Sequence, residues 1–171
     1  MVDLVVGAPL DDDGVHRAGA VYVVILETNG IVKNAQKISM LHANFNAFYS
    51  LGDTNFFGMP VAMLDDLDAN AVVDLAVGAI DDHAGGKWVG AVFILFLDQN
   101  ATSVKNAQKI SMLYGNFNLF YSLSSTDNSN LGSAVRVLGV LSGDGVEYLA
   151  VGAYTADDGA FSAGEVFILF L

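Results

Sequence analysis

Cysteine is absent from the 171-residue chain, so the sequence offers no disulfide framework and no thiolate for catalysis or metal binding. No apolar run approaches the roughly 20 residues of a membrane-spanning helix, so we expect no membrane insertion. The first residues show no basic segment or cleavage site, and no signal peptide is expected there. Glycine-rich phosphate loops, nucleophile elbows and zinc-protease motifs are also missing. Carboxylates are abundant, but they lie in periodic turns, so we expect a protein that is not an enzyme.

Positive charge is scarce, with 7 Lys and Arg against 19 Asp and Glu and a net charge of −12. Nucleic acid is therefore not an expected partner, because no basic patch could meet its phosphates. Cations and basic partners are favoured instead. Hydrophobic residues make up 53% of the chain, which argues against disorder, and 18 glycines among Val, Phe, Tyr and Leu indicate strands and turns.

Internal repetition organises the chain. The segment 3–8 (DLVVGA) recurs in similar form at 74–79 and 148–153, offsets of 71 and 74 residues. Two further segments repeat in the same way: 19–26 recurs at 90–97 and 164–171, and 36–41 recurs unchanged at 108–113. The chain thus holds about 2.3 copies of a unit of roughly 72 residues. We divide it into a partial repeat at 1–56, a complete one at 57–130 and a partial one at 131–171.

Each complete unit is expected to form four antiparallel strands. The predicted strands are 58–64 and 132–138 (strand one), 3–8, 74–79 and 148–153 (strand two), 19–26, 90–97 and 164–171 (strand three), and 35–41 and 107–113 (strand four). A four-stranded antiparallel unit in tandem is the blade of a β-propeller, and 2.3 such units are too few to close a ring. The uniformly apolar run 93–97 predicts an inner strand that is covered on both faces.

An acidic loop lies between the first two strands of the complete unit. Asp66, Asp68, Asn70 and Asp74 stand at loop positions 1, 3, 5 and 9, which brings hard oxygen ligands together as Ca²⁺ requires. We predict Ca²⁺ at these four side chains, with the carbonyl of Val72 contributing, and no metal in the corresponding loop of the 140s. The alternative is a solvated hairpin turn, since Asp and Asn are common turn residues.

Several of these motifs together resemble a known repeat family. Phe57-Gly58 opens the unit, the acidic loop follows, and Gly78-Ala79 closes the next strand, while Gly7-Ala8-Pro9 shows the full triplet. This pattern is similar to the FG-GAP repeat of integrin alpha-chain β-propellers and of large bacterial and algal surface proteins. The resemblance implies a structural Ca²⁺, and a partner-binding face formed by the loops after strands two and four.

Those loops carry two kinds of residue. Acidic pairs or triplets follow strand two, at 11–13, 81–82 and 157–158, and are read either as a partner surface or as ordinary solvated turns. The segments 36–51 and 108–123 match at 13 of 16 positions and include aromatic residues after strand four. Because both units carry these aromatics, we favour packing over an adhesive strip. Asn100 begins the sequon Asn100-Ala101-Thr102, a possible glycosylation site.

From the sequence we therefore predict a non-enzymatic, Ca²⁺-stabilised repeat module, extracellular or on the cell surface, that builds a surface structure or fibre. Its expected partners are copies of itself or further repeats of the same chain. The alternative is an adhesion module that binds protein or glycan through its acidic and aromatic loops. A more distant alternative is a non-catalytic domain of a hydrolase.

Overall fold

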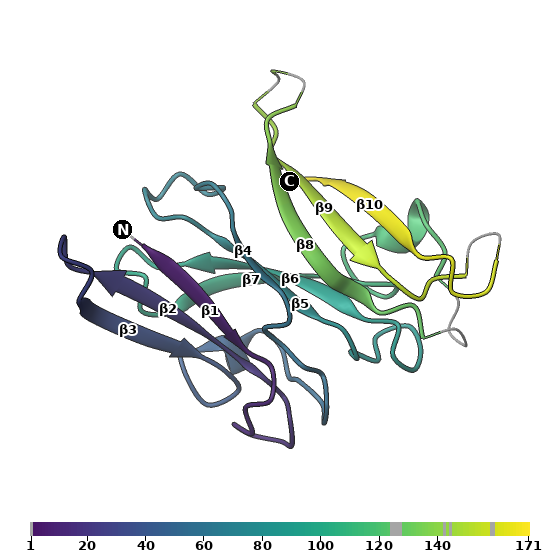
Figure 1. Ribbon diagram of the computed structural model, residues 1–171, viewed down its shortest axis with the longest axis horizontal. Helices are drawn as coiled ribbons and strands as arrows, with labels where there is room; N and C mark the ends of the chain where they lie inside the picture. Colours follow the sequence, from purple (N-terminus) through teal and green to yellow (C-terminus); the bar gives the residue numbers. More distant parts are fainter. Residues whose placement is uncertain (1, 124–127, 142, 144, 158–159) are drawn as a thin grey trace.

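The computed structural model describes residues 2–123, 128–141, 143, 145–157 and 160–171, and the regular secondary structure of these residues is almost wholly β-strand (Figure 1). The strands form three antiparallel sheets, within which hydrogen-bonded neighbours follow one another along the chain. Sheet 1 holds β1 (Leu4–Ala8), β2 (Ala20–Leu26) and β3 (Val32–Ile38); sheet 2 holds β4 (Val61–Met63), β5 (Leu75–Ala79), β6 (Ala91–Leu97) and β7 (Val104–Ile110); sheet 3 holds β8 (Leu131–Gly139), β9 (Tyr148–Ala153) and β10 (Glu165–Phe170).

Helical structure among the described residues is confined to two short 3₁₀ turns, η1 (Phe45–Ala47) and η2 (Phe117–Leu119). The expectation of an all-β protein with antiparallel sheets is confirmed. Within the same residues, no helix has the length and apolar character that crossing a membrane would require.

Three of the predicted strands differ from the structure in position or length. The strands expected at 35–41 and 107–113 begin and end three residues earlier, as β3 and β7. The chain turns at Ser39, which pairs with His42 in an isolated bridge, and Leu41 is 64% exposed in that turn. The prediction extends into this turn because Leu41 is apolar and fits the pattern of a strand. The strand expected at 58–64 is shortened to β4, since Pro60 has no N–H to donate to a ladder.

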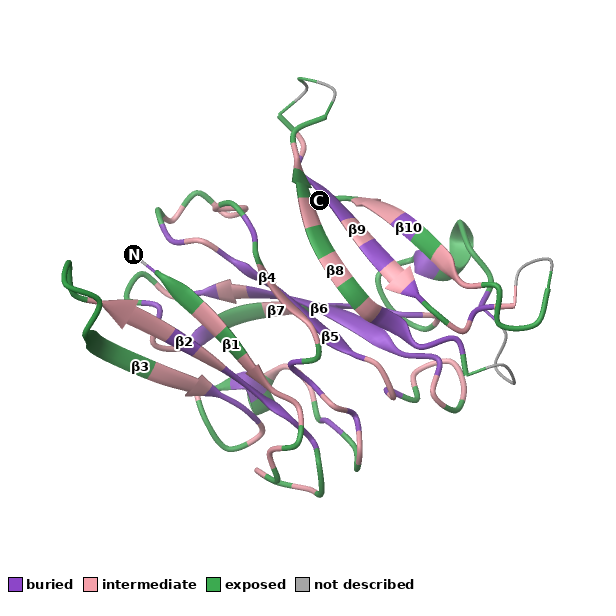
Figure 2. Ribbon diagram, in the orientation of Figure 1, coloured by how far each residue is buried: buried purple, intermediate pink, exposed green. Residues whose placement is uncertain are grey.

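The three sheets are stacked face to face, with sheet 2 in the middle. The strand β8 packs against β5 and β4, and β4 packs against β1. Figure 2 shows the consequence as a band of buried residues along β5 and β6 in the centre of the molecule. The side chains of Phe93 and Leu95 face sheet 1, whereas those of Val92 and Ile94 face sheet 3. The prediction of an inner strand covered on both faces is therefore confirmed for β6.

Adjacent sheets are also joined through their backbones at the start of each new unit. The N–H of Phe57 donates to the carbonyl of Ala18 at 2.9 Å, which ties the entry to sheet 2 onto sheet 1. The N–H of Leu131 donates to the carbonyl of Val89 at 2.7 Å, which ties sheet 3 onto sheet 2 in the same way. The two junctions repeat one geometry, as the internal repetition of the sequence leads one to expect.

Glycine is required where these junctions bring two backbones into contact. A Cβ built on Gly7 would lie 1.9 Å from the carbonyl oxygen of Gly58, and one on Gly78 would lie 2.2 Å from that of Gly132. No real Cβ tolerates such a distance, so a side chain at either position would force the sheets apart. The glycines of the repeated motifs thus set the spacing between neighbouring sheets.

The aromatic loops after the fourth strands pack between the sheets. The ring of Phe45 lies 4.8 Å from that of Phe57 and 5.7 Å from that of Phe93, and Phe117 lies 5.1 Å from Phe167. Phe45 and Phe117 are both buried. Each loop therefore reaches from its own unit onto the following sheet, which confirms the packing interpretation for these two residues.

Candidate metal centre

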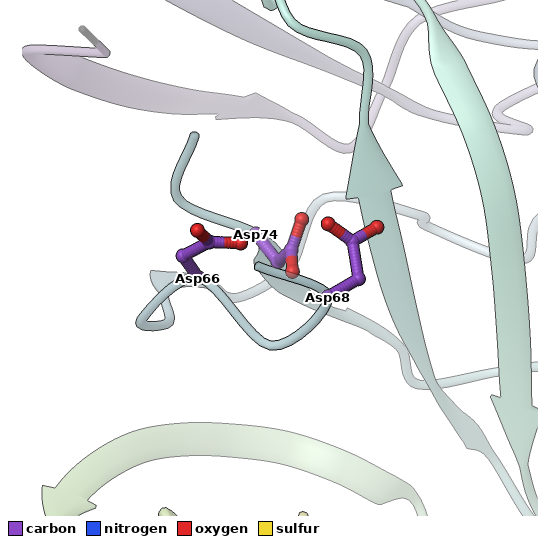
Figure 3. A group of neighbouring side chains, drawn as sticks. All are labelled: Asp66, Asp68 and Asp74. Atoms are coloured by element: carbon purple, nitrogen blue, oxygen red, sulfur yellow. The ribbon is translucent and has the colours of Figure 1, made fainter. Parts of the chain in front are cut away.

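The loop between β4 and β5 gathers three carboxylates. Asp66, Asp68 and Asp74 each offer an oxygen, and these oxygens all lie within 4.8 Å of one another. Figure 3 shows the three side chains converging where the loop folds back on the start of β5. The acidic side chains of the predicted calcium loop are therefore brought together.

Asp66 shapes the loop through its own backbone contacts. Its two carboxylate oxygens accept hydrogen bonds from the N–H groups of Asn70 (2.9 Å) and Ala71 (2.6 Å). Partial desolvation opposes ionisation, but these N–H donors hold the pKa of Asp66 below its usual value. Ala71 has φ of 69°, in the left-handed region that glycine usually occupies at a sharp turn. The loop thus makes a tight turn around an ionised carboxylate.

Asp74 is the buried member of the group. It lies just before β5 with no exposed surface, and it accepts hydrogen bonds from the N–H groups of Leu67 (3.0 Å) and Leu97 (3.2 Å). Burial raises the pKa of Asp74 to about 6, and repulsion from Asp68 and Asp66 adds to the shift. A bound cation would remove this penalty, because it supplies the positive charge that the buried carboxylate lacks.

Asp68 has one satisfied and one unsatisfied oxygen. Its Oδ2 lies 2.7 Å from the ammonium of Lys105 on β7, whereas its Oδ1 is buried without a hydrogen-bond partner. Buried polar atoms are nearly always paired, so an orphaned carboxylate oxygen beside two further carboxylates calls for an explanation. A metal ligand is one such explanation, and it makes the donor set suitable for a hard cation.

Asn70 and Val72 make different contacts from the three aspartates. The amide of Asn70 donates to the carbonyl of Leu97 at 2.8 Å, and its oxygen accepts from the N–H of Val72 at 2.7 Å. Asn70 therefore fastens the loop to the end of β6. Ligation by Asn70 and by the carbonyl of Val72 stays a prediction. Three carboxylates fit part of the 6–8 oxygens that Ca²⁺ takes, with backbone oxygens and water as the usual remainder.

Among the described residues, no second group of three carboxylates is found at the equivalent positions of the other units. In sheet 3, Tyr148 takes the place of Asp74, and its ring packs 4.8 Å from that of Phe170. Ser142 and Asp144, which also align with the acidic loop, lie outside the described residues. In sheet 1, Asp3 corresponds to Asp74 and makes one of its contacts. Its carboxylate accepts a hydrogen bond from the N–H of Leu26 at 2.9 Å, as that of Asp74 does from the N–H of Leu97.

A fourth acidic residue near the loop could not be found from the sequence. Glu147 comes from the turn before β9 and is only 5% exposed. Its two oxygens accept from the N–H of Asp65 at 3.1 and 3.2 Å, and burial raises its pKa. This contact ties sheet 3 to the acidic loop across 82 residues of sequence, a distance over which no local pattern gives a signal.

Three aspartates in the acidic turns after the second strands form ion pairs with lysines. Lys37 lies 2.7 Å from both Asp11 and Asp13, and Lys109 lies 2.7 Å from the buried Asp82. These ion pairs fasten the turns to the fourth strands and give them a structural role. Asp158 lies outside the described residues, and a partner-binding role for this end of the sheets stays a prediction.

Asn100 lies exposed in the turn between β6 and β7. Asp98 organises that turn by accepting hydrogen bonds from the N–H groups of Asn100 (3.2 Å) and Thr102 (2.7 Å) and from the Thr102 hydroxyl (3.0 Å). The asparagine side chain is accessible, and its glycosylation stays a prediction.

No protein-family model matches the sequence, and no curated protein matches it. The similarity to the FG-GAP repeat therefore rests on the sequence motifs alone.

Proposed function

We propose that this protein is a non-enzymatic repeat module of the FG-GAP type that Ca²⁺ stabilises and that builds an extracellular or cell-surface assembly. In this proposal each sheet is a propeller-type blade. The observation that carries it is the group of carboxylates Asp66, Asp68 and Asp74 in the loop between β4 and β5 of the central sheet. The orphaned, buried oxygen of Asp68 supports a cation at this point.

The bound cation would have a structural role. Bound Ca²⁺ supplies positive charge and oxygen coordination, and Asp66, Asp68 and Asp74 would hold it. Asp74 and Asn70 already tie the loop to Leu97 at the end of β6. Neutralising the carboxylates would therefore stiffen the connection between β4, β5 and β6, on which both neighbouring sheets pack.

An adhesion module is the second candidate. It is favoured by large apolar side chains on loops, since Phe120 is 77% exposed after β7 and Phe161 is 91% exposed after β9. Exposed aromatic side chains beside acidic turns suit contacts with a protein or a glycan. This function would use the loop end of the sheets and would leave the calcium loop with the same structural role.

The calcium proposal is tested by thermal unfolding in a Ca²⁺ titration up to about 10 mM, since extracellular calcium modules bind with Kd near 10⁻⁴–10⁻³ M. We expect the melting temperature to rise, with stabilisation approaching about 2.7 kcal/mol at 100 times Kd. The double variant Asp66→Ala with Asp68→Ala should abolish the rise.

The matched control is Glu27→Ala with Asp53→Ala, which removes the same charge from two exposed positions outside the loop. Its response to Ca²⁺ should equal that of the wild type. An unchanged melting temperature in the wild type, or equal stabilisation of both double variants, would contradict the proposal.

A further inference from the structure

The outer face of sheet 3 carries the same apolar residue types that are buried on sheet 2. Residues 74 positions apart correspond between β6 and β10, so Val166 and Phe170 match Val92 and Phe96. Val92 is fully buried under sheet 3. Val166 is 72% exposed and Phe170 is 68% exposed, because no sheet of the described chain lies over them. This face, with Val166, Ile168 and Phe170, is called the back face below.

The outer face of sheet 1 is the counterpart on the other side of the stack. Leu4 and Val6 correspond to Leu75 and Val77, which lie 71 positions later and are fully buried against sheet 1. Leu4 is 47% exposed and Val6 is 43% exposed. The side chain of Val5, between them, packs inward instead. This outward face of β1 and β2, with Leu4 and Val6, is called the front face below.

The two internal junctions supply a template for what covers these faces. At each junction, the face of one sheet that corresponds to the back face packs against the face of the next sheet that corresponds to the front face. Aliphatic and aromatic side chains meet across the junction. We therefore expect the front and back faces to fit each other. At neither internal junction does a face pack against a second face of the same kind.

We propose that a second copy of this chain docks its front face onto the back face, which continues the stack of sheets from one molecule into the next. This inference deepens the proposed assembly function by naming the partner and the two surfaces. The contact is head-to-tail, so each docked copy presents a new free face and growth leads to a ring or a filament. Because each copy carries a net charge of −12, association should strengthen as salt rises.

The test uses sedimentation velocity of the wild type and of two singly blocked variants, Val6→Asp on the front face and Val166→Asp on the back face. The wild type should associate in a concentration-dependent way up to about 1 mM, while each variant alone should stay monomeric. An equimolar mixture of the two variants should form dimers and nothing larger, since each supplies the one intact face that the other lacks. Leu113→Asp, at an exposed turn residue outside both faces, should associate like the wild type.

A wild type that stays monomeric throughout would overturn the proposal. So would a single variant that still dimerises, because this would mean that like faces pair, or a mixture that stays monomeric. Leu4→Asp and Phe170→Asp repeat the experiment at a second position on each face, so a misfolded variant does not decide it. Calcium stabilisation measured on the same samples separates the two ideas, because the calcium loop lies in sheet 2 and is intact in every variant.

Discussion

Lys105 is the residue that would compete most directly with a cation for the acidic loop. Its ammonium lies 2.7 Å from Asp68 and is 41% exposed, so the ion pair is of the surface kind, worth roughly 0.2–1 kcal/mol. Ca²⁺ at Asp68 would have to displace it. We expect Lys105→Met to tighten Ca²⁺ binding by up to about fivefold, because each 1.4 kcal/mol corresponds to a factor of ten. Isothermal titration calorimetry measures this directly.

The chain provides a matched control for this variant. The strand β3 has the same seven residues as β7, and its Lys33 is exposed at the position of Lys105 without an acidic loop beside it. Lys33→Met should leave the calcium affinity unchanged. Equal affinities in the two variants and the wild type would show that the ion pair does not limit binding.

At the scale of the strands and their junctions, Gly78 and Gly152 occupy the same motif position in β5 and β9 but have different surroundings. A Cβ on Gly78 would lie 2.2 Å from the carbonyl oxygen of Gly132, whereas one on Gly152 would meet the Cβ of Ala134 at 3.2 Å. We expect Gly78→Ala to lower the free energy of unfolding by roughly 1–3 kcal/mol, because two backbones must move apart. Gly152→Ala should change it by less than about 1 kcal/mol.

Urea denaturation of both variants gives the comparison. A large loss in Gly152→Ala, or none in Gly78→Ala, would mean that the glycines do not set the spacing of the sheets. The pair also separates a packing effect from helix or strand propensity, since both glycines belong to strands and have the same neighbours, Val and Ala.

The strands and the acidic loop differ in how far the sequence could predict them. Runs of Val, Leu and Phe identified the inner strands because burial on both faces leaves a uniformly apolar pattern. The predicted positions of the fourth strands were three residues too late in the sequence, because Leu41 is apolar yet exposed in a turn. The spacing of Asp66, Asp68 and Asp74 placed them correctly in one loop, since alternate residues of a tight turn converge.

Contacts between residues far apart in the sequence were beyond any local pattern. Glu147 meets the backbone of Asp65 from another unit, 82 positions away in the sequence. Lys109 pairs with Asp82, 27 positions away, and Lys105 pairs with Asp68, both within the complete unit. The contact of Glu147 depends on how the sheets stack, and the two lysine pairs depend on how the loops fold back on β7, neither of which a local sequence pattern encodes. The structural role of the acidic turns therefore became visible only in three dimensions.

For the whole molecule, a stack of sheets that contact only their neighbours should have its stability concentrated in the middle. The strands β2 and β6 allow a matched comparison, because each is hydrogen-bonded on both sides within its sheet. They differ in the cover of their faces, since β6 is buried on both and β2 on one. Any difference in their amide exchange therefore reports on stacking.

We expect the amides of 92–95 in β6 to exchange with deuterium more slowly than those of 21–24 in β2, measured on the monomer at low concentration by NMR or mass spectrometry. Loss of sheet 1 or sheet 3 by local opening uncovers only one face of sheet 2, so the central strand keeps its hydrogen bonds until the last step. Equal protection of the two strands would instead mean that the three sheets open together. At concentrations where copies dock, the front face gains a cover, and the exchange of β2 should slow toward that of β6 while β6 stays the same.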